Sequence, residues 1–183
     1  MGRRQLLLSI YIPALSMSLC RGLILPVMPL FALSFEVSYA MVGVLLAAEG
    51  VGNLLADIPA GTLVQRLGRR RSMLFGAVIM GLMALAMAQA TLLWEAAAYR
   101  FVSGIGMALW NIARHAYITQ MVDVGIRGRT NAGLGGLGRV AGFAAPVVGG
   151  FMAESAGLQA PFILYAMLSV TGFISAWIWI PQD

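Results

Sequence analysis

Six long apolar stretches follow one another along the chain, and short segments with charged or turn-forming residues separate them. The stretches cover residues 6–35, 37–63, 72–93, 95–118, 130–152 and 160–180. A helix needs about 20 residues to cross a hydrocarbon core of about 30 Å, so each stretch is long enough for one crossing. Too little sequence lies between the stretches for a soluble domain. The pattern therefore predicts an all-α membrane protein with six transmembrane helices, forming one domain over residues 1–183.

The composition agrees with a membrane protein and excludes two other classes. Of the 183 residues, 60% are hydrophobic and 10% are charged, whereas soluble domains carry about 25% charged residues. A mean hydropathy of +0.86 excludes an intrinsically disordered chain. The net charge of +5 does not indicate a nucleic-acid partner, because the arginines lie in short clusters between apolar stretches. Cys20 is the only cysteine, so we expect no disulfide, no cysteine-bound metal and no cofactor.

Charged residues are divided unevenly between the two ends of the predicted helices. One set of ends holds Arg3, Arg4, Arg66, Arg69, Arg70, Arg71, Arg114, Arg127 and Arg129. The other set holds Glu36, Glu95 and Glu154 and no arginine. Short loops rich in arginine stay on the cytoplasmic side of a membrane. We therefore expect a multi-pass protein of a bacterial cytoplasmic membrane, surrounded by the lipid bilayer, with both termini in the cytoplasm.

Several charged residues also fall inside the predicted helices, where a charge is costly unless it meets a partner or a water-filled cavity. They are Arg21, Glu49, Asp57, Arg100 and Arg139. By helical rise, Arg21 lies about 22 Å and Glu49 about 20 Å from the cytoplasmic ends of their helices. The two residues therefore lie at the same depth. An ion pair between them would allow proton exchange at Glu49, and a permanent structural pair is the alternative.

Small residues are concentrated in the second and fifth stretches. The fifth includes Gly138, Gly142, Pro146, Gly149 and Gly150, which we interpret as a packing face and hinge, since glycines allow close approach and proline removes an amide donor. In the second, Ala48, Gly52, Ala56 and Ala60 recur every four residues. These small residues would form a smooth surface along the helix that could slide against another helix bundle. Ordinary packing within one bundle is the alternative.

Three segments resemble motifs of the major facilitator superfamily of transporters. Between the second and third stretches, Gly61, Leu63, Arg66, Gly68, Arg69 and Arg70 match the family's cytoplasmic loop Gly-x-Leu-Ala-Asp-Arg-x-Gly-Arg-Lys. Gln65 stands where the family has its aspartate. Arg100 and the Ser-Gly-Ile-Gly that follows Val102 resemble the fourth-helix motif, and residues 142–150 resemble the end of the antiporter motif in the fifth helix, with Ala145 in place of a glycine.

The resemblance implies a fold and a set of partners. The family usually has twelve helices in two halves, each built from two inverted three-helix repeats. This chain corresponds to the amino-terminal half, and its partner would be a second six-helix lobe, either a carboxy-terminal half or another copy. The equal spacing of Gly61 to Gly68 and Gly150 to Gly157 agrees with an internal repeat.

The resemblance also implies roles for particular residues. Arg21, Glu49, Arg100 and Arg139 would line a substrate cavity, with Glu49 and Asp57 as proton carriers. The loop Gly61, Gln65, Arg66, Gly68, Arg69 and Arg70 would act in gating. The implied function is proton-coupled efflux of a small organic molecule or drug by alternating access. Symport of a small metabolite, such as an anionic one, stays open, as does a non-transporting scaffold or half-size fragment.

The residues do not favour an enzyme. Ser103 and His115 lie on one predicted helix, about 18 Å apart by rise, which is too far for a nucleophile and its base. The chain also has no phosphate-binding Gly-x-x-x-x-Gly-Lys-Ser/Thr loop. An ion gradient, rather than ATP hydrolysis within this chain, is therefore the expected driving force.

Overall fold

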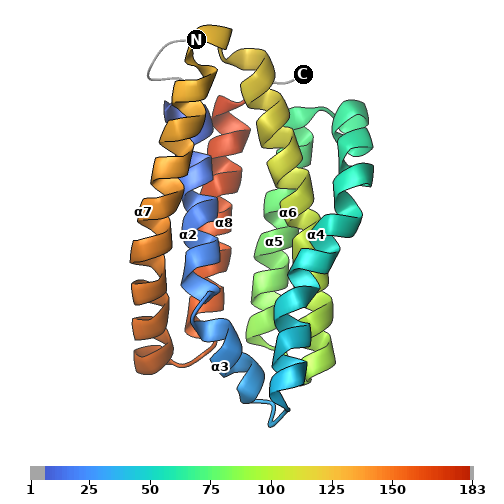
Figure 1. Cartoon of the computed structure of the whole chain (residues 1–183), viewed down its shortest axis with the longest axis vertical. Helices are drawn as coiled ribbons and strands as arrows, with labels where there is room; N and C mark the ends of the chain where they lie inside the picture. The colour runs from blue at the N-terminus through green and yellow to red at the C-terminus, as the bar shows by residue number, and fades with distance from the viewer. Residues whose placement is uncertain (1–6, 182–183) are drawn as a thin grey trace.

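A computed structural model describes residues 7–181 of the chain, and this part is almost entirely helical (Figure 1). Arg3 and Arg4, which contribute to the predicted cytoplasmic end, lie outside the described residues. The elements are η1 (Leu7–Tyr11), α2 (Ile12–Ile24), α3 (Val27–Leu33), α4 (Tyr39–Leu67), α5 (Arg69–Ala88), α6 (Leu93–Met121), α7 (Val124–Ala156) and α8 (Ala160–Trp179). The predicted all-α class is confirmed.

The first predicted stretch is not one continuous helix. A π-helical turn, η1, leads into α2, and α3 follows with a bend of 42° between the two helical segments. Pro26 is the residue before α3, and Pro29 lies within it. Each proline removes a backbone donor, so the helix breaks where the sequence places them. The apolar count alone did not reveal this break.

The count of six membrane crossings is not confirmed by length and hydropathy. Four single helices of the described chain, α4, α5, α7 and α8, are long and apolar enough to cross a membrane, and the bent pair brings the number to as many as five. Helix α6 is as long as α4 but is not among them. It contains Arg100, Asn111 and Arg114, which lower its hydropathy.

The helices form two groups that meet along α5 and α8 (Figure 1). In one group α2 packs against α7 and α8, and in the other α6 packs against α4 and α5. The turn between α4 and α5, the turn between α6 and α7, and the end of α8 all lie at one end of the bundle. The arginines of these segments are therefore gathered at one end, as the charge pattern predicts.

Helices α4 and α7 share a repeated pattern. Gly68 ends α4 with φ 86° and ψ 160°, and Gly157 ends α7 with φ 93° and ψ 161°. Both conformations need glycine, because φ is strongly positive. The interval between these glycines also relates the buried residues Gly52, Ala56 and Ala60 of α4 to Ala141, Ala145 and Gly149 of α7. The internal repeat is thus visible in backbone conformation and burial as well as in glycine spacing.

The stripe of small residues in α4 is used inside the lobe. A Cβ on Gly52 would collide with the backbone of Phe101 in α6, and Ala56 and Ala60 pack in a buried cluster with Ala108 and Leu109. Gly149 of α7 meets the backbone of Leu23 in the same way. The interpretation of the α4 stripe as a free sliding surface is therefore wrong, and packing within one bundle holds. By contrast, a Cβ at Gly142 or Gly150 would meet nothing within 4 Å, and one at Gly138 would meet only Ser18 Oγ at 4.0 Å.

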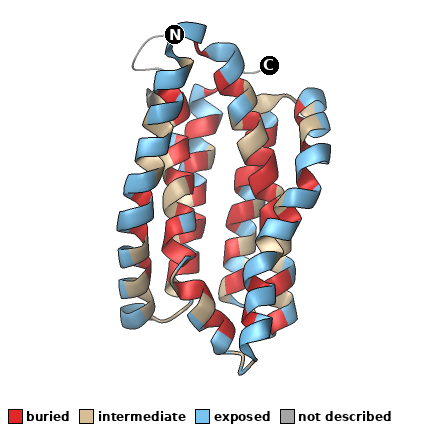
Figure 2. Ribbon diagram, in the orientation of Figure 1, coloured by how far each residue is buried: buried red, intermediate tan, exposed pale blue. Residues whose placement is uncertain are grey.

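The buried side chains lie between the helices, and the outer faces of α4 and α7 are largely exposed (Figure 2). Phe31 contacts Phe162 edge-on with ring centroids 4.9 Å apart, and Trp110 and Tyr117 are almost fully buried. Large apolar side chains stand exposed on α4, including Ile58, and on α7, including Phe143. These faces suit lipid or another helical lobe better than water.

Candidate functional site

A nearly buried ion pair joins α4 and α6. Arg100 Nη1 contacts the Glu49 carboxylate, and each side chain is only 12% exposed. Gly104, one turn along α6 from Arg100, explains why the helices approach so closely. A Cβ there would lie 2.8 Å from the amide nitrogen of Asn53 and would also collide with the Glu49 backbone. The missing side chain thus allows the two opposite charges to neutralise each other away from water.

The structure pairs Glu49 with Arg100 and not with Arg21. Arg21 is exposed on α2, which packs against α7 and α8, whereas α4 packs against α6. Equal depth in the membrane was therefore not enough to bring Arg21 and Glu49 together, because α2 packs mainly against α7 and α8 and not against α4.

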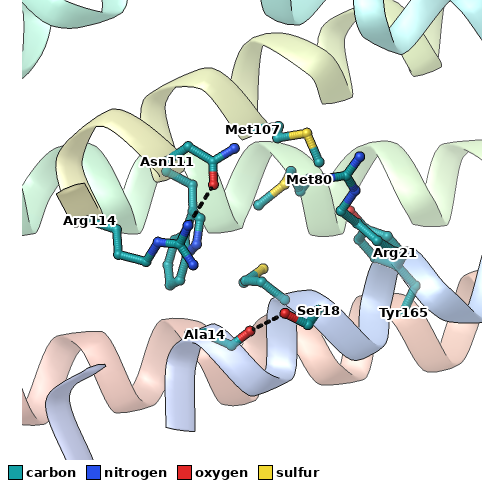
Figure 3. A pocket seen from close by; sticks show the side chains of 10 residues that line it. Ala14, Ser18, Arg21, Met80, Met107, Asn111, Arg114 and Tyr165 are labelled. Atoms are coloured by element: carbon teal, nitrogen blue, oxygen red, sulfur yellow. Dashed lines mark hydrogen bonds between the residues drawn. The ribbon is translucent and has the colours of Figure 1, made fainter. Parts of the chain in front are cut away.

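Arg21 instead lines a cavity of about 110 Å³ between the two helix groups (Figure 3). Helix α2 contributes Ala14, Met17, Ser18 and Arg21, and α6 contributes Met107, Trp110, Asn111 and Arg114. Met80 of α5 and Tyr165 of α8 complete the wall. In each of α2 and α6 the four residues lie at positions i, i+3, i+4 and i+7, which is a single helix face. The cavity thus extends about 10 Å along both helices.

The polar groups of this cavity are mostly hydrogen-bond donors. Arg114 donates from Nη2 to Asn111 Oδ1 at 3.4 Å, while Ser18 donates to the Ala14 carbonyl at 2.9 Å (Figure 3). Arg114 Nε and Trp110 Nε1 are buried without an acceptor in the described part of the chain. The cavity lining contains no acidic side chain. Its electrostatic character is therefore positive.

A smaller cavity of about 10 Å³ lies beside the ion pair. It is lined by Arg100 and Ser103 of α6, by Tyr165 of α8, and by methionines that include Met28. Tyr165 is 3% exposed and lines both cavities. Tyr165 is therefore a shared wall between the arginine-lined cavity and the small cavity beside the ion pair. A movement of its ring would change the shape of both cavities.

The other predicted cavity residues lie elsewhere. Asp57 is exposed on α4 and Arg139 is exposed on α7, and neither lines the two cavities just described. Each lies next to an exposed apolar residue, Ile58 in α4 and Val140 in α7.

The loop between α4 and α5 makes contacts within the lobe. Arg69 Nη1 donates to Gln120 Oε1 near the end of α6. Arg70 donates to the Trp177 carbonyl in the last turn of α8 and lies 4.8 Å from the Trp177 ring centroid. Gln65 and Arg66 are exposed, and a Cβ on Gly61 would meet nothing within 4 Å. The loop arginines thus form contacts near the carbonyl-rich ends of α6 and α8.

Sequence reasoning missed part of the arginine-lined cavity. Arg114 was assigned to a cytoplasmic helix end, and Trp110 and Asn111 were not singled out. The available signal was their spacing, because Met107, Trp110, Asn111 and Arg114 recur on one face of α6. Among the described residues, no group of three or more His, Cys, Asp or Glu side chains is placed to hold a metal ion.

Comparisons with known proteins identify the same kind of protein that the sequence motifs indicate. The model of the Major Facilitator Superfamily matches residues 10–183. The chain is 24% identical over 184 residues to the multidrug transporter MdfA of Yersinia pestis (strain Angola), covering all of this chain and 45% of that protein. It is 30% identical over 164 residues to the class B tetracycline resistance protein of Escherichia coli, covering 86% and 40%. It is 26% identical over 155 residues to multidrug resistance protein 2 of Bacillus subtilis (strain 168), covering 85% and 38%. The chain spans less than half the length of these relatives.

Proposed function

This chain belongs to the Major Facilitator Superfamily, a family of membrane transporters and not of enzymes, and on that premise we propose that it is one lobe of a secondary active transporter. The segments η1, α2 and α3 form one broken crossing, and α4 to α8 supply five more. The two inverted repeats then run from η1 to α5 and from α6 to α8, so that α4 and α7 are equivalent helices and each helix group contains members of both repeats. A second six-helix lobe closes the substrate path, and the lobes alternate between inward and outward openings.

The observation that carries the proposal is the nearly buried pair of Arg100 and Glu49. The attraction of the arginine offsets the cost of burying a carboxylate at this depth. Protonation of Glu49 cancels that attraction and leaves Arg100 needing another anion or water. The pair is therefore a two-state element between α4 and α6, and a proton biases it.

We assign the direction of transport as efflux by proton exchange. Two findings support this: the helix-five segment resembles the antiporter motif, and the relatives are named as multidrug and tetracycline resistance proteins. Asp57 and Arg139, exposed on α4 and α7, would face the second lobe, with Asp57 as a second proton carrier. The loop from Gly61 to Arg70 would act in gating.

The arrangement of charges at the bundle ends supports a cytoplasmic-membrane topology. The arginine-bearing turns lie at one end of the bundle, together with the start of η1 and the end of α8, and we assign this end to the cytoplasm by the positive-inside rule. Symport is the second candidate. The positive cavity favours it for an anionic solute, because a proton would offset the solute's charge.

Flux in liposomes tests the proposal. The chain and a tandem fusion of two copies would be reconstituted, and tetracycline uptake would be followed with and without a pH gradient. We expect saturable, gradient-dependent uptake in the two-lobed form, and its loss in Glu49→Gln. Glu154→Gln, at the opposite bundle end, is the matched control and keeps the flux. Gradient-independent uptake, or normal uptake by Glu49→Gln, would contradict the proposal.

A further inference from the structure

The arginine-lined cavity contains more hydrogen-bond donors than the surrounding protein satisfies. Trp110 is 2% exposed, and its indole N–H has no acceptor in the described chain; the same is true of Arg114 Nε. Burying a donor without an acceptor is costly, and burying a guanidinium without an anion costs more. This end of the cavity therefore lacks a negatively charged acceptor.

The protein's own acids do not supply that acceptor. Glu49 is engaged by Arg100, and no acidic side chain lines the cavity. Asn111 offers its oxygen to Arg114, which leaves its NH₂ group as a further donor, and the Ser18 hydroxyl is directed to the Ala14 carbonyl. Trp110, Asn111 and Arg114 thus bring three donor groups to one face of α6, with no carboxylate among the lining residues.

Three methionine side chains supply an apolar part of the cavity wall. Met17, Met80 and Met107 line the cavity, and Figure 3 shows Met80 and Met107 between Arg114 and Arg21. Methionine side chains adapt to irregular apolar shapes, aromatic rings included. The volume of about 110 Å³ is of the same order as the engineered cavity of about 150 Å³ that holds benzene. Trp110 and Met107 are buried, whereas Arg21 is exposed and therefore accessible to a solute outside the cavity.

We propose that this cavity is an organic-anion subsite that binds a small carboxylate with a compact apolar body. The carboxylate accepts hydrogen bonds from Arg114, Trp110 Nε1 and the Asn111 amide, and the apolar body contacts the methionines. The exposed Arg21 attracts the anion to the cavity. As the substrate class of the transporter, this inference rests on the transport function proposed above and favours its symport form; as a binding site, it is tested without transport.

Tyr165 gives the subsite a physical route to the ion pair. Its ring lines the anion cavity on one side and the small cavity of Arg100 and Ser103 on the other. An anion that moves Tyr165 therefore changes the surroundings of Arg100. This is the contact through which substrate binding would bias the protonation of Glu49.

Calorimetric titration of the full purified chain in nanodiscs tests the subsite. The three probes have similar shapes and differ in charge. Benzoate is anionic, benzamide is neutral and benzylammonium is cationic at neutral pH. We expect benzoate to bind about tenfold more tightly than benzamide, and benzylammonium to bind more weakly than either, because charge-assisted hydrogen bonds are the stronger ones. Similar affinities for the three probes, or preference for the cation, would overturn the proposal.

Variants locate the binding. Arg114→Gln should reduce benzoate affinity to the level of benzamide while leaving benzamide unchanged, and Trp110→Phe should weaken benzoate by a smaller factor. Arg21 is exposed, so Arg21→Gln should fold even if a variant in the core does not. It should also weaken the binding of benzoate and leave that of benzamide unchanged. Arg129→Gln, exposed at the start of α7 outside the cavity, is the charge-matched control and retains full affinity. Unchanged benzoate binding in both Arg21→Gln and Arg114→Gln would refute the subsite.

The outcomes separate the two proposals. Selective benzoate binding without any proton-dependent flux would leave the subsite standing and remove the transport function. Proton-dependent flux without preference for benzoate would leave the transport function standing and remove the subsite.

Discussion

Gly104 of α6 lies directly against the backbone of Glu49 in α4, and the ion pair between Glu49 and Arg100 depends on that approach. A side chain at residue 104 would have to displace backbone atoms, since a Cβ would lie 2.8 Å from the amide nitrogen of Asn53. Backbone atoms of a helix cannot move aside as the end of a flexible side chain can. A side chain at residue 104 would therefore force α4 and α6 apart.

Gly104→Val should therefore destabilise the lobe by about 1–3 kcal/mol or more, as overpacking does. It should also weaken the Arg100–Glu49 pair. Thermal unfolding in detergent measures the loss. Gly43→Val is the matched control on α4, because a Cβ at Gly43 meets nothing within 4 Å. Equal stability of the two variants would show that the α4–α6 contact is looser than described.

The Arg100–Glu49 pair should show strong coupling in a double-mutant cycle. Removing one partner leaves a buried charge, so Arg100→Ala and Glu49→Ala should each cost about 3–5 kcal/mol. The double variant should cost less than their sum. Denaturant unfolding of the parent, the two single variants and the double variant gives the coupling free energy between the two side chains. Additive losses would mean that the charges are individually solvated. Arg100→Lys should restore only part of the stability, since lysine lacks the planar fork of arginine.

The contact of Arg70 with Trp177 should tie the start of α5 to the end of α8. Arg70→Ala removes the donor to the Trp177 carbonyl and the cation over its ring. We expect a loss of about 1 kcal/mol, the usual size for such a contact at a partly exposed site. Arg71→Ala, an exposed neighbour with the same charge, should have little effect. Indistinguishable melting curves for Arg70→Ala and the parent would contradict this assignment.

The topology is tested by labelling of introduced cysteines. Arg71→Cys should react with a membrane-impermeant maleimide only after permeabilisation of the cells, and Glu154→Cys should react in intact cells. Both positions are exposed, whereas the native Cys20 is buried and should stay silent. Reaction of Arg71→Cys from outside would invert the proposed orientation.

Association of the lobe should involve the exposed face of α7. Gly142 has open space around it, and Phe143, Val147 and Phe151 are exposed beside it. Gly142→Leu should therefore leave the fold intact and weaken self-association through close helix packing. Light scattering in detergent would report the mass, and circular dichroism the fold. A monomeric parent chain, or loss of fold in Gly142→Leu, would argue against this face as the contact.

The sequence by itself determined the class of the protein and much of its outline. Apolar run length gave the membrane class and the approximate helix ranges, and the arginines gave one positively charged end. The loop from Gly61 to Arg70, together with Arg100, carried the family resemblance that the match over residues 10–183 bears out. These features follow from local chemistry, because hydration of a charge and the apolarity of a run do not depend on which helix lies beside them.

Only the tertiary structure decided which charges meet. Helical rise correctly gives a residue's position along its own axis, but it does not identify the neighbouring helix or the rotation of each face. Glu49 pairs with Arg100 because Gly52 and Gly104 let α4 and α6 approach to backbone contact. Arg21 and Arg114 share a cavity because the matching faces of α2 and α6 line it together. Such contacts depend on shape complementarity between surfaces distant in sequence, which no periodicity within a single helix records.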